Sequence, residues 1–574
     1  MRQGRSLHVA ALGLLAALLG GCLTPGEQAD SADAEVGALL DKLHTEVLSG
    51  REREVLQPAP AAKPEPVAPQ LPPEGEGPSP GGGPGQESKA AGRASEADLT
   101  APLDSSSPDA IKLDLRSSLA LAVGTGREYL DRQDSLYLAG LSLTLTRYNF
   151  GPILNSTIST LWHDSEGQPS STELLGTFGV SQILDTGGTA TFDSHVSRTH
   201  IASTHSVDTD GDPFTDPVKV LDPVYSSGLG FDLSQPLLRG SGYLVSHEAL
   251  TQGERNVVYA VRDFELFRED FSIDVARDFY DLVSRKASIA NLEQSWRDAV
   301  FDATKSVALR QVDRIQDVDV FNARRREIDA ENQLIEARTD YKSALDDFKI
   351  KIGLATNAPV VLSDEEPVYR AVNLDEESAV AVALANRLDL MNARERLEDT
   401  ERQVIIARDA LQPELGLDLG YHLNNDSSDF NHITPDRWDA TAALTLNLPL
   451  NLQEERNAYR AALISVDESR RNLQLEFDNV ERDVRSQLRT LRQFDQQIEL
   501  QKEQIQQELR AVAVTQIKYE SGDAQSRDLL DARKSLVEAQ NQLIDLQAQH
   551  VIARLRLFRN LGILFLGDDG MWIE

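Results

Sequence analysis

Two carboxylates stand three residues apart near the end of the chain, just after an expected bend. Asp528 and Asp531 follow Gly522, and on a helix this spacing puts both side chains on the same side. Neighbouring carboxylates repel each other and attract cations. The pair therefore indicates either a site that concentrates cations or two ordinary charges on a solvated helix surface, and the spacing alone leaves both interpretations open.

The other polar groups predict no catalytic residue, no cofactor site and no metal site. The ten histidines are scattered, and His195, His200 and His205 fall in a strand and loop region without partners at metal-binding spacing. The acidic residues 208–216 lack the glycine and glutamate positions of a calcium loop, so we interpret them as an external loop. We expect no enzyme activity. The formal net charge of −35 argues against a nucleic-acid partner, because phosphate binding needs basic surface.

The first residues have the layout of an export signal followed by a lipid attachment site. Residues 1–21 combine two arginines with a short apolar run, as in a secretory signal peptide. Small residues precede Cys22, the only cysteine, which predicts cleavage before Cys22 and its acylation; ordinary cleavage beside an incidental cysteine is the alternative. Residues 22–56 then form a lipid-anchored segment with one short helix, and the Pro- and Gly-rich residues 57–108 form a disordered linker.

A long helical hairpin is expected to position the carboxylate pair. Residues 449–566 show an apolar seam in steps of three and four, which is typical of a coiled coil. Before the bend this seam consists of Leu473, Phe477, Val480, Val484, Leu488, Leu491, Phe494, Ile498, Ile505, Leu509 and Val512. As one helix, the roughly 70 residues before the bend would span on the order of 100 Å at about 1.5 Å per residue.

The hairpin occurs twice, so the chain is an internal duplication. Residues 319–324 match residues 528–533 at an offset of 209 (528 − 319), and the same offset relates Gly353 to Gly562. We therefore divide the folded part into a first repeat at 109–366, a second repeat at 367–566 and a C-terminal tail at 567–574.

Each repeat also contains weakly hydrophobic segments with partial alternation, which we interpret as strands. They are residues 154–161, 174–184, 189–196 and 227–233 in the first repeat, and 415–423 and 438–448 in the second. Such strands suit a membrane β-barrel with one face to lipid and one to water. Open sheet edges cannot face lipid, and four to six strands are too few to close a barrel alone. Several copies of the chain must therefore close it together.

These features resemble the TolC family of outer-membrane factors. The resemblance covers roughly residues 111–566 and is strongest at YESGDAQSRDLLDAR (519–533) and DVDVFNARRREIDAENQLIEA (317–337). It implies an α+β membrane protein: duplicated long α-helical hairpins form an α-barrel, and the β-strands join a shared trimeric transmembrane β-barrel. Family members contribute four strands per protomer. The first repeat here carries 48 extra residues (261 − 213, the offsets of the prolines before and after the strands), so four and six strands both remain open.

By the same resemblance the chain is a passive exit channel of the outer membrane, lipid-anchored and extending into the periplasm. It would serve a tripartite efflux pump or a type I secretion system, as a homotrimer that binds a periplasmic adaptor protein and is supplied by an inner-membrane transporter. Asp528 and Asp531 would ring the narrowest opening, at the periplasmic tip. The alternative is a lipid-anchored periplasmic coiled-coil scaffold without a pore. The transporter selects the cargo, so the sequence does not identify it.

The resemblance further implies a lock at the hairpin tips. Asp319 and Tyr519 match family residues that hold neighbouring hairpins closed through hydrogen bonds. The basic partner of that lock is missing, because Ala524 occupies its place. Arg314 and Arg527 are the two basic residues close enough in sequence to substitute for it.

Overall fold

The computed structural model describes residues 25–47, 100–103, 110–164, 170–201, 223–313, 315–365, 367–427, 437–521, 523–524 and 526–573. The predicted signal peptide, Cys22, nearly all of the linker and the acidic residues 208–216 lie outside the described residues. The chain divides into two compact units. The first comprises residues 1–39, 137–260 and 392–475, and the second comprises residues 40–136, 261–391 and 476–574.

Helices account for most of the described chain, and the longest of them run uninterrupted for more than 60 residues. They are α2 (Pro25–Val47), α4 (Leu115–Thr125), α5 (Arg127–Phe150), α6 (Tyr243–Ser246), α7 (Glu248–Gln311), α8 (Asp317–Lys351), α9 (Glu376–Asn386), α10 (Leu388–Asp409), α11 (Gln453–Ser521) and α12 (Ser526–Leu561). None of the helices in the described part of the chain is both long and apolar enough to cross a membrane.

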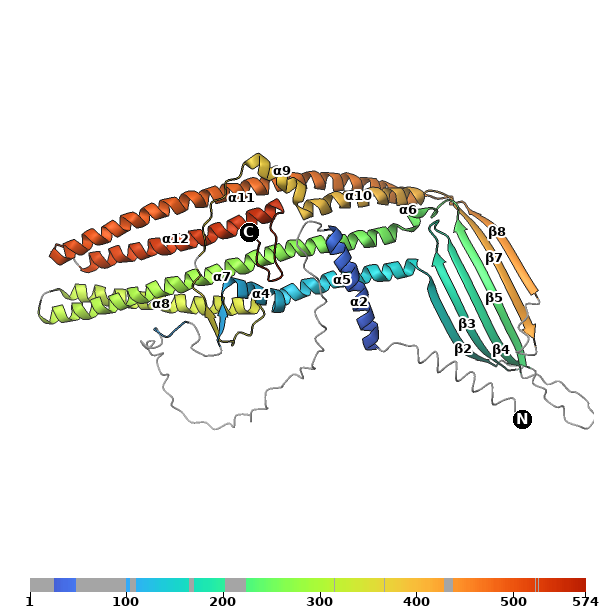
Figure 1. Cartoon of the computed structure of the whole chain (residues 1–574), viewed down its shortest axis with the longest axis horizontal. Helices are drawn as coiled ribbons and strands as arrows, with labels where there is room; N and C mark the ends of the chain where they lie inside the picture. The colour runs from blue at the N-terminus through green and yellow to red at the C-terminus, as the bar shows by residue number, and fades with distance from the viewer. Residues whose placement is uncertain are drawn as a thin grey trace, which may run out of the picture. The chain divides into compact units, whose positions relative to one another are not determined.

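The first unit contains one antiparallel sheet of six strands, in the order β2-β3-β4-β5-β7-β8 (Figure 1). The strands are β2 (Ile153–His163), β3 (Ser171–Ile183), β4 (Thr189–Ile201), β5 (Pro223–Pro236), β7 (Glu414–Ser427) and β8 (Arg437–Asn447). Each strand expected from the sequence is present. The first repeat contributes four strands and the second contributes two, so the extra residues of the first repeat add a hairpin, β3 and β4, to the sheet itself.

The two faces of this sheet differ in polarity along every strand. Residues paired across a sheet point to the same face, and their neighbours one position along point to the other. One row of paired residues is apolar, and consists of Leu154, Val180, Phe192, Phe231, Tyr421 and Ala440. The next row faces the opposite side, and consists of Asn155, Gly179, Asp193, Gly230, His422 and Asp439. The apolar face is exposed: Trp162 and Trp438 on it are 66% and 71% exposed, which excludes buried packing of these aromatics within one chain.

The turn of the inserted hairpin is anchored to the corner between the sheet and the helices. The glycine turn predicted between β3 and β4 is present: Leu184 N–H donates to the Gly188 carbonyl at 2.7 Å, and Gly187 adopts a positive φ of 88°. The Thr186 carbonyl accepts hydrogen bonds from the N–H of Gly242 at 2.9 Å and from Nε2 of Gln235 at 3.1 Å. The hairpin is thereby fixed to the chain just before α6.

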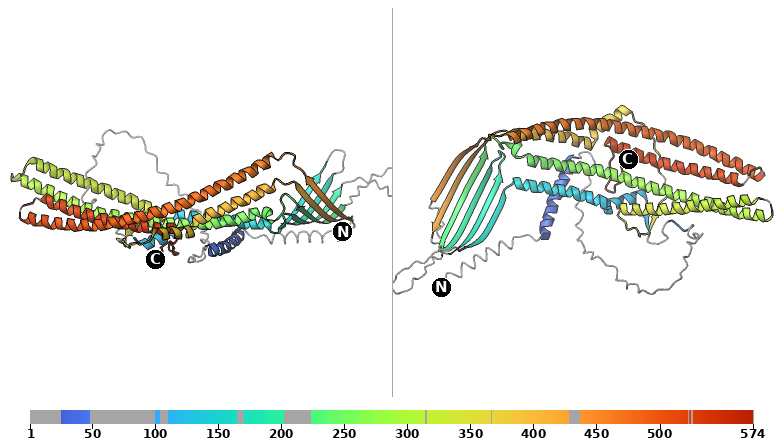
Figure 2. Two further views of the ribbon diagram at one scale, coloured as in Figure 1. Left: turned by 90° about the horizontal axis from the view of Figure 1, so that it is seen from above. Right: turned by 180° about the vertical axis from the view of Figure 1, so that it is seen from behind.

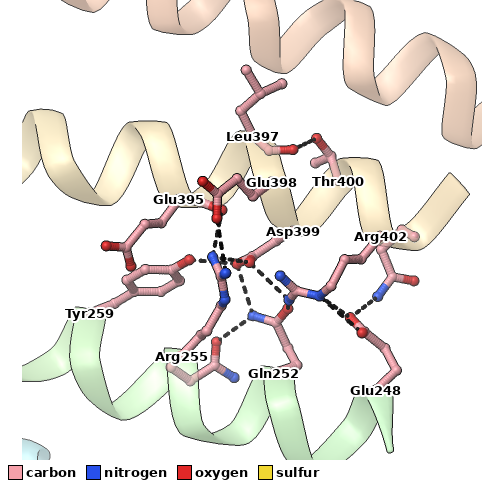
Figure 3. Close-up of polar contacts among 12 residues, drawn as sticks. Glu248, Gln252, Arg255, Tyr259, Glu395, Leu397, Glu398, Asp399, Thr400 and Arg402 are labelled. Atoms are coloured by element: carbon pink, nitrogen blue, oxygen red, sulfur yellow. Dashed lines mark hydrogen bonds and ion pairs between the residues drawn. The ribbon is translucent and has the colours of Figure 1, made fainter. Parts of the chain in front are cut away.

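A polar network between α7 and α10 holds two helices of the first unit together (Figure 3). The buried Asp399 is at its centre, and its carboxylate accepts a hydrogen bond of 2.6 Å from the Tyr259 hydroxyl. The same carboxylate lies 3.2 Å from Nη1 of Arg255 and 2.9 Å from Nη2 of Arg402. Glu248 extends the network, 3.0 Å from Nε of Arg402. Burial and the bond to Asp399 raise the pKa of Tyr259 to about 12, so its hydroxyl remains a donor at neutral pH.

The second unit contains the ends of two helical hairpins, in which α8 runs beside α7 and α12 beside α11 (Figure 2). The central part of the seam predicted on α11 is buried, with exposures of at most 3%, at Val480, Val484, Leu488, Leu491 and Ile498. Closer to the tip the seam opens to solvent, since Leu509 is 44% exposed. On α11, therefore, the middle of the seam is firmly packed and the end closer to the tip is more exposed.

The duplication is visible in one contact that occurs in both repeats of the second unit. Gly353 follows α8 and Gly562 follows α12, with φ of 79° and 69°. A Cβ on Gly353 would lie 2.1 Å from the carbonyl oxygen of Thr125, at the end of α4, and a Cβ on Gly562 would lie 2.7 Å from that of Asn386, at the end of α9. Only glycine permits both the positive φ and this close approach. A short parallel pair, β1 (Ile111–Leu113) with β6 (Val360–Leu362), joins the start and end of the first repeat.

Replacing Asp399 by Asn should destabilise the first unit by about 3 kcal/mol, because two partly buried arginines then lose their shared counter-charge. The matched control is Glu398→Gln. Glu398 also pairs with Arg255, at 2.9 Å, but its side chain is 60% exposed, and exposed pairs contribute about 0–1 kcal/mol. Urea denaturation followed by circular dichroism measures both variants. Equal losses would contradict a stabilising role for the buried carboxylate.

Candidate functional site at the tips of the helical hairpins

The tip of the first hairpin is closed by Arg310, near the end of α7. Its Nε lies 2.6 Å from Oδ1 of Asp317, the first residue of α8, and its Nη1 contacts Asp313 in the turn. Asp313 adopts a positive φ of 55°, the only non-glycine residue of the described chain to do so. The bond from Arg310 keeps the pKa of Asp317 below its usual value. The charge pair thus fixes the reversal between the two helices.

Asp319, for which the family resemblance implies a role in a lock between hairpins, caps its own helix. Its Oδ2 accepts a hydrogen bond of 3.2 Å from the backbone N–H of Gln316, the residue before α8. This satisfies one of the N–H groups that a helix start leaves without a partner. The side chain is exposed, and its other carboxylate oxygen can accept a further bond from a neighbouring hairpin.

The tip of the second hairpin closes through backbone hydrogen bonds. The carbonyl of Lys518, in the last turn of α11, accepts bonds from the N–H groups of Asp523 at 2.8 Å and Ala524 at 3.2 Å. Bonds of this kind satisfy carbonyls at a helix end. Ala524 therefore serves the turn through its backbone, and its methyl side chain offers no charge for a lock. The predicted bend at Gly522 lies outside the described residues, but helices end and begin on either side of it.

The carboxylate pair lies at the start of α12, as predicted. Asp528 is in the first turn and Asp531 follows three residues later, and both are exposed. The start of a helix carries partial positive charge, which favours a carboxylate in its first turn. Each chain therefore presents two carboxylates on one side of α12 close to the tip. A ring of such pairs needs several chains and stays a prediction.

The two hairpins meet through a contact that the sequence did not reveal. The ammonium group of Lys305, on α7, lies 5.9 Å from the ring centre of Tyr519, on α11. Tyr519 is 37% exposed, and cation–π contacts at exposed sites contribute about 0.5–1 kcal/mol. Arg314 and the side chain of Arg527, the two substitutes considered for the missing basic partner, lie outside the described part of the chain. Lys305 supplies a basic group beside Tyr519 instead.

A second contact joins the same hairpins further from the tips. Nδ2 of Asn291 on α7 donates a hydrogen bond of 2.8 Å to Oδ1 of Asn541 on α12. Helix α7 therefore contacts both helices of the second hairpin, α11 at the tip and α12 below it. No spacing rule predicts either contact, because each joins residues more than 200 positions apart, and only the pairing of the two hairpins brings them together.

Residues 379–563 match a family model described as outer membrane efflux protein. This segment is similar to the outer membrane efflux protein family. The matched segment contains β7, β8, α11 and α12, and with them Tyr519, Asp528 and Asp531; Asp319 lies in the first repeat, outside the match. No curated protein matches the sequence.

Solved structures of outer-membrane proteins share the fold. The outer membrane protein VceC of Vibrio cholerae has 14% identity and a TM-score of 0.56, over 78% of this chain and 96% of that chain. The outer membrane channel CmeC of Campylobacter jejuni has 15% identity and a TM-score of 0.55, over 78% and 85%. The MtrE outer membrane channel of Neisseria gonorrhoeae has 13% identity and a TM-score of 0.54, over 78% and 89%. The predicted combination of long helical hairpins with a sheet is confirmed.

The contact between Lys305 and Tyr519 can be separated from the predicted hydroxyl lock by two substitutions at one position. Tyr519→Phe keeps the ring and its contact with Lys305 but removes the hydroxyl, whereas Tyr519→Ala removes both. If the ring contact holds the tips, Tyr519→Ala should speed amide hydrogen exchange in the last turns of α11 about threefold, as expected for the loss of about 0.7 kcal/mol, and Tyr519→Phe should not. Equal acceleration in both variants would instead assign the effect to the hydroxyl.

Proposed function

We propose that the chain is one subunit of a passive outer-membrane channel, which receives cargo from an inner-membrane transporter through a periplasmic adaptor protein. One observation carries this proposal: all six strands align an exposed apolar face on one side and a polar face on the other. Such a sheet suits lipid on its apolar side and water on its polar side. The family match and the named channels among the structural neighbours support the same function.

The edges of the sheet support assembly from several chains. β2 and β8 are the end strands of the six, so each leaves a row of backbone groups unpaired within one chain. Unpaired groups facing lipid cost several kcal/mol each. Pairing β2 of one protomer with β8 of the next removes both edges. A homotrimer, as the family resemblance implies, would then have eighteen strands, three times the six of one chain.

The extra hairpin would make this barrel wider than one built from four strands per chain. Barrel diameter grows roughly linearly with the number of strands. Eighteen strands therefore give a diameter about 1.5 times that of twelve. The widening concerns the membrane part only, because the inserted β3 and β4 have no counterpart among the helices that form the hairpins.

A lipid-anchored coiled-coil scaffold is the rival function, and the sheet disfavours it. A scaffold has no use for six strands with an exposed apolar face, which would remain in water. The lipid anchor itself is compatible with both functions. We infer that Cys22 is acylated, because small residues and an apolar run precede it; the mass of the mature N-terminal peptide decides this.

The channel would open by separation of the hairpin tips. The tips are held by weak contacts, such as the exposed pair of Lys305 and Tyr519, while the seam below them is buried. Splaying the tips therefore breaks few contacts and leaves the packed part intact. Asp528 and Asp531 of each chain would then line the opening and attract cations. The channel performs no reaction of its own.

Planar-bilayer recording with the purified full-length protein tests the channel. The expected result is stepwise ion conduction by an oligomer that dissociates on heating in detergent. Electron micrographs of that oligomer, seen end-on, should show a membrane ring about 1.5 times as wide as that of a twelve-stranded barrel. A monomer whose sheet closes on itself, or an assembly that binds lipid without conducting, would contradict the channel and favour the scaffold.

Neutralising the carboxylate pair should weaken block by divalent cations. In the double variant Asp528→Asn, Asp531→Asn, we expect the cation concentration for half-block to rise about fivefold, because losing the attraction of exposed carboxylates removes about 1 kcal/mol. The matched control is Glu503→Gln, Glu508→Gln, which removes two charges from α11 at 18 and 13 residues before its last residue, Ser521 (521 − 503 and 521 − 508). Unchanged block in the first variant, or equal weakening in both, would remove the pair from the constriction.

A further inference from the structure

Three metal-binding side chains converge on the polar face of the sheet. Asp193 lies on β4, Asp232 on β5 and His422 on β7, three neighbouring strands. A carboxylate oxygen of each aspartate and a ring nitrogen of the histidine all lie within 4.8 Å of one another. Nε2 of His422 is 3.2 Å from Oδ1 of Asp232. The three are held by strand register, since Asp193 and His422 both pair with Gly230.

Two glycines form the floor beneath these side chains. A Cβ on Gly230 would lie 2.3 Å from Oδ1 of Asp193 and 2.8 Å from Nδ1 of His422. A Cβ on Gly420, which pairs with Asp232, would lie 2.9 Å from Oδ1 of Asp232 and 3.2 Å from Nε2 of His422. Glycine weakens a strand interior, and there it often marks a place where a ligand or another group approaches the backbone closely. Here the absent side chains let the ligand atoms lean together over the backbone.

We propose that Asp193, Asp232 and His422 bind a divalent transition-metal ion. One imidazole nitrogen with two carboxylate oxygens suits Zn²⁺, Mn²⁺, Ni²⁺ or Cu²⁺, whereas Mg²⁺ and Ca²⁺ prefer oxygen ligands alone. Three protein ligands leave further positions for water. All three side chains are only partly buried, so an ion can enter and leave from the polar side of the sheet.

A cross-strand ion pair between His422 and Asp232 alone accounts for less of the arrangement. Their side chains are 33% and 48% exposed, and a pair this accessible to water contributes little to stability. An ion pair between His422 and Asp232 gives no role to Asp193. It also does not require glycine at positions 230 and 420. A bound cation accounts for all three side chains, because it would relieve the repulsion between the two carboxylates. It also accounts for the glycine floor, which leaves the three ligand atoms room to approach one another.

The site can be tested without any assumption about conduction, because its ligands belong to one chain. Calorimetric titration of the untagged, chelator-stripped full-length protein with Zn²⁺ should show one site per protomer. His422→Asn should weaken binding at least tenfold. His163→Gln is the matched control: His163 lies on the polar face of β2, two strands from β4, and its loss should leave the affinity unchanged. Absence of stoichiometric binding, or equal affinity in His422→Asn and the parent, overturns the proposal.

A pair of glycine substitutions tests the floor while leaving every ligand in place. Gly230→Ala should abolish the site, because the new methyl group occupies the space between Asp193 and His422. Gly416→Ala, in β7, is the control, because a Cβ there meets nothing within 4 Å. Electron paramagnetic resonance with Cu²⁺ adds a direct reading: coupling to one imidazole nitrogen is expected, and it should vanish in His422→Asn. Full binding by Gly230→Ala, or retained coupling without His422, overturns the assignment.

Discussion

Backbone hydrogen bonding in an apolar medium is the constraint on which the rest of the structure depends. The sheet exposes a continuous apolar face, and in lipid its end strands, β2 and β8, cannot stay unpaired. Under the proposed function, copies of the same chain supply the missing partners of these two strands. Because side chains alternate along each strand, the polar face of the sheet then faces water. The proposed pore follows from the pairing of end strands between protomers.

The burial of the apolar seam changes along α11. The seam of α11 is buried at Val480, Val484, Leu488, Leu491 and Ile498. In each repeat a glycine at the end of the hairpin packs closely against a short helix. Among the described residues near the tips, the contacts include the exposed pair of Lys305 and Tyr519 between the hairpins and the ion pair of Arg310 with Asp317 within the first hairpin. Opening at the tips, as proposed, would separate the exposed end of α11 and leave its buried middle in place.

Patterns among neighbouring residues in the sequence predicted the strands, the helical hairpins and the glycines that follow them. Alternation predicted all six strands, the seam predicted the hairpins, and the offset of 209 predicted the equivalent glycines, Gly353 and Gly562. Alternation could not predict that the extra residues of the first repeat would pair inside the sheet. The sequence pointed to His195 because other histidines lie near it in the chain. It did not point to His422, because only the strand register brings His422 beside Asp232, 190 residues away (422 − 232). The contact of Lys305 with Tyr519 was also not predicted, because the two residues lie far apart in the sequence.

The inserted hairpin shows how an antiparallel sheet of this kind can gain strands during evolution. In an antiparallel sheet each strand reverses direction, so β2 and β5 run opposite ways whether or not β3 and β4 stand between them. The two added strands start and end on the side of the sheet away from the helices, and only the turn between them, with Thr186, reaches the corner before α6. A single added strand would carry the chain out at the far side and separate it from its helix. Strands are therefore added to such a sheet in pairs, and the connections between the sheet and the helices stay in place.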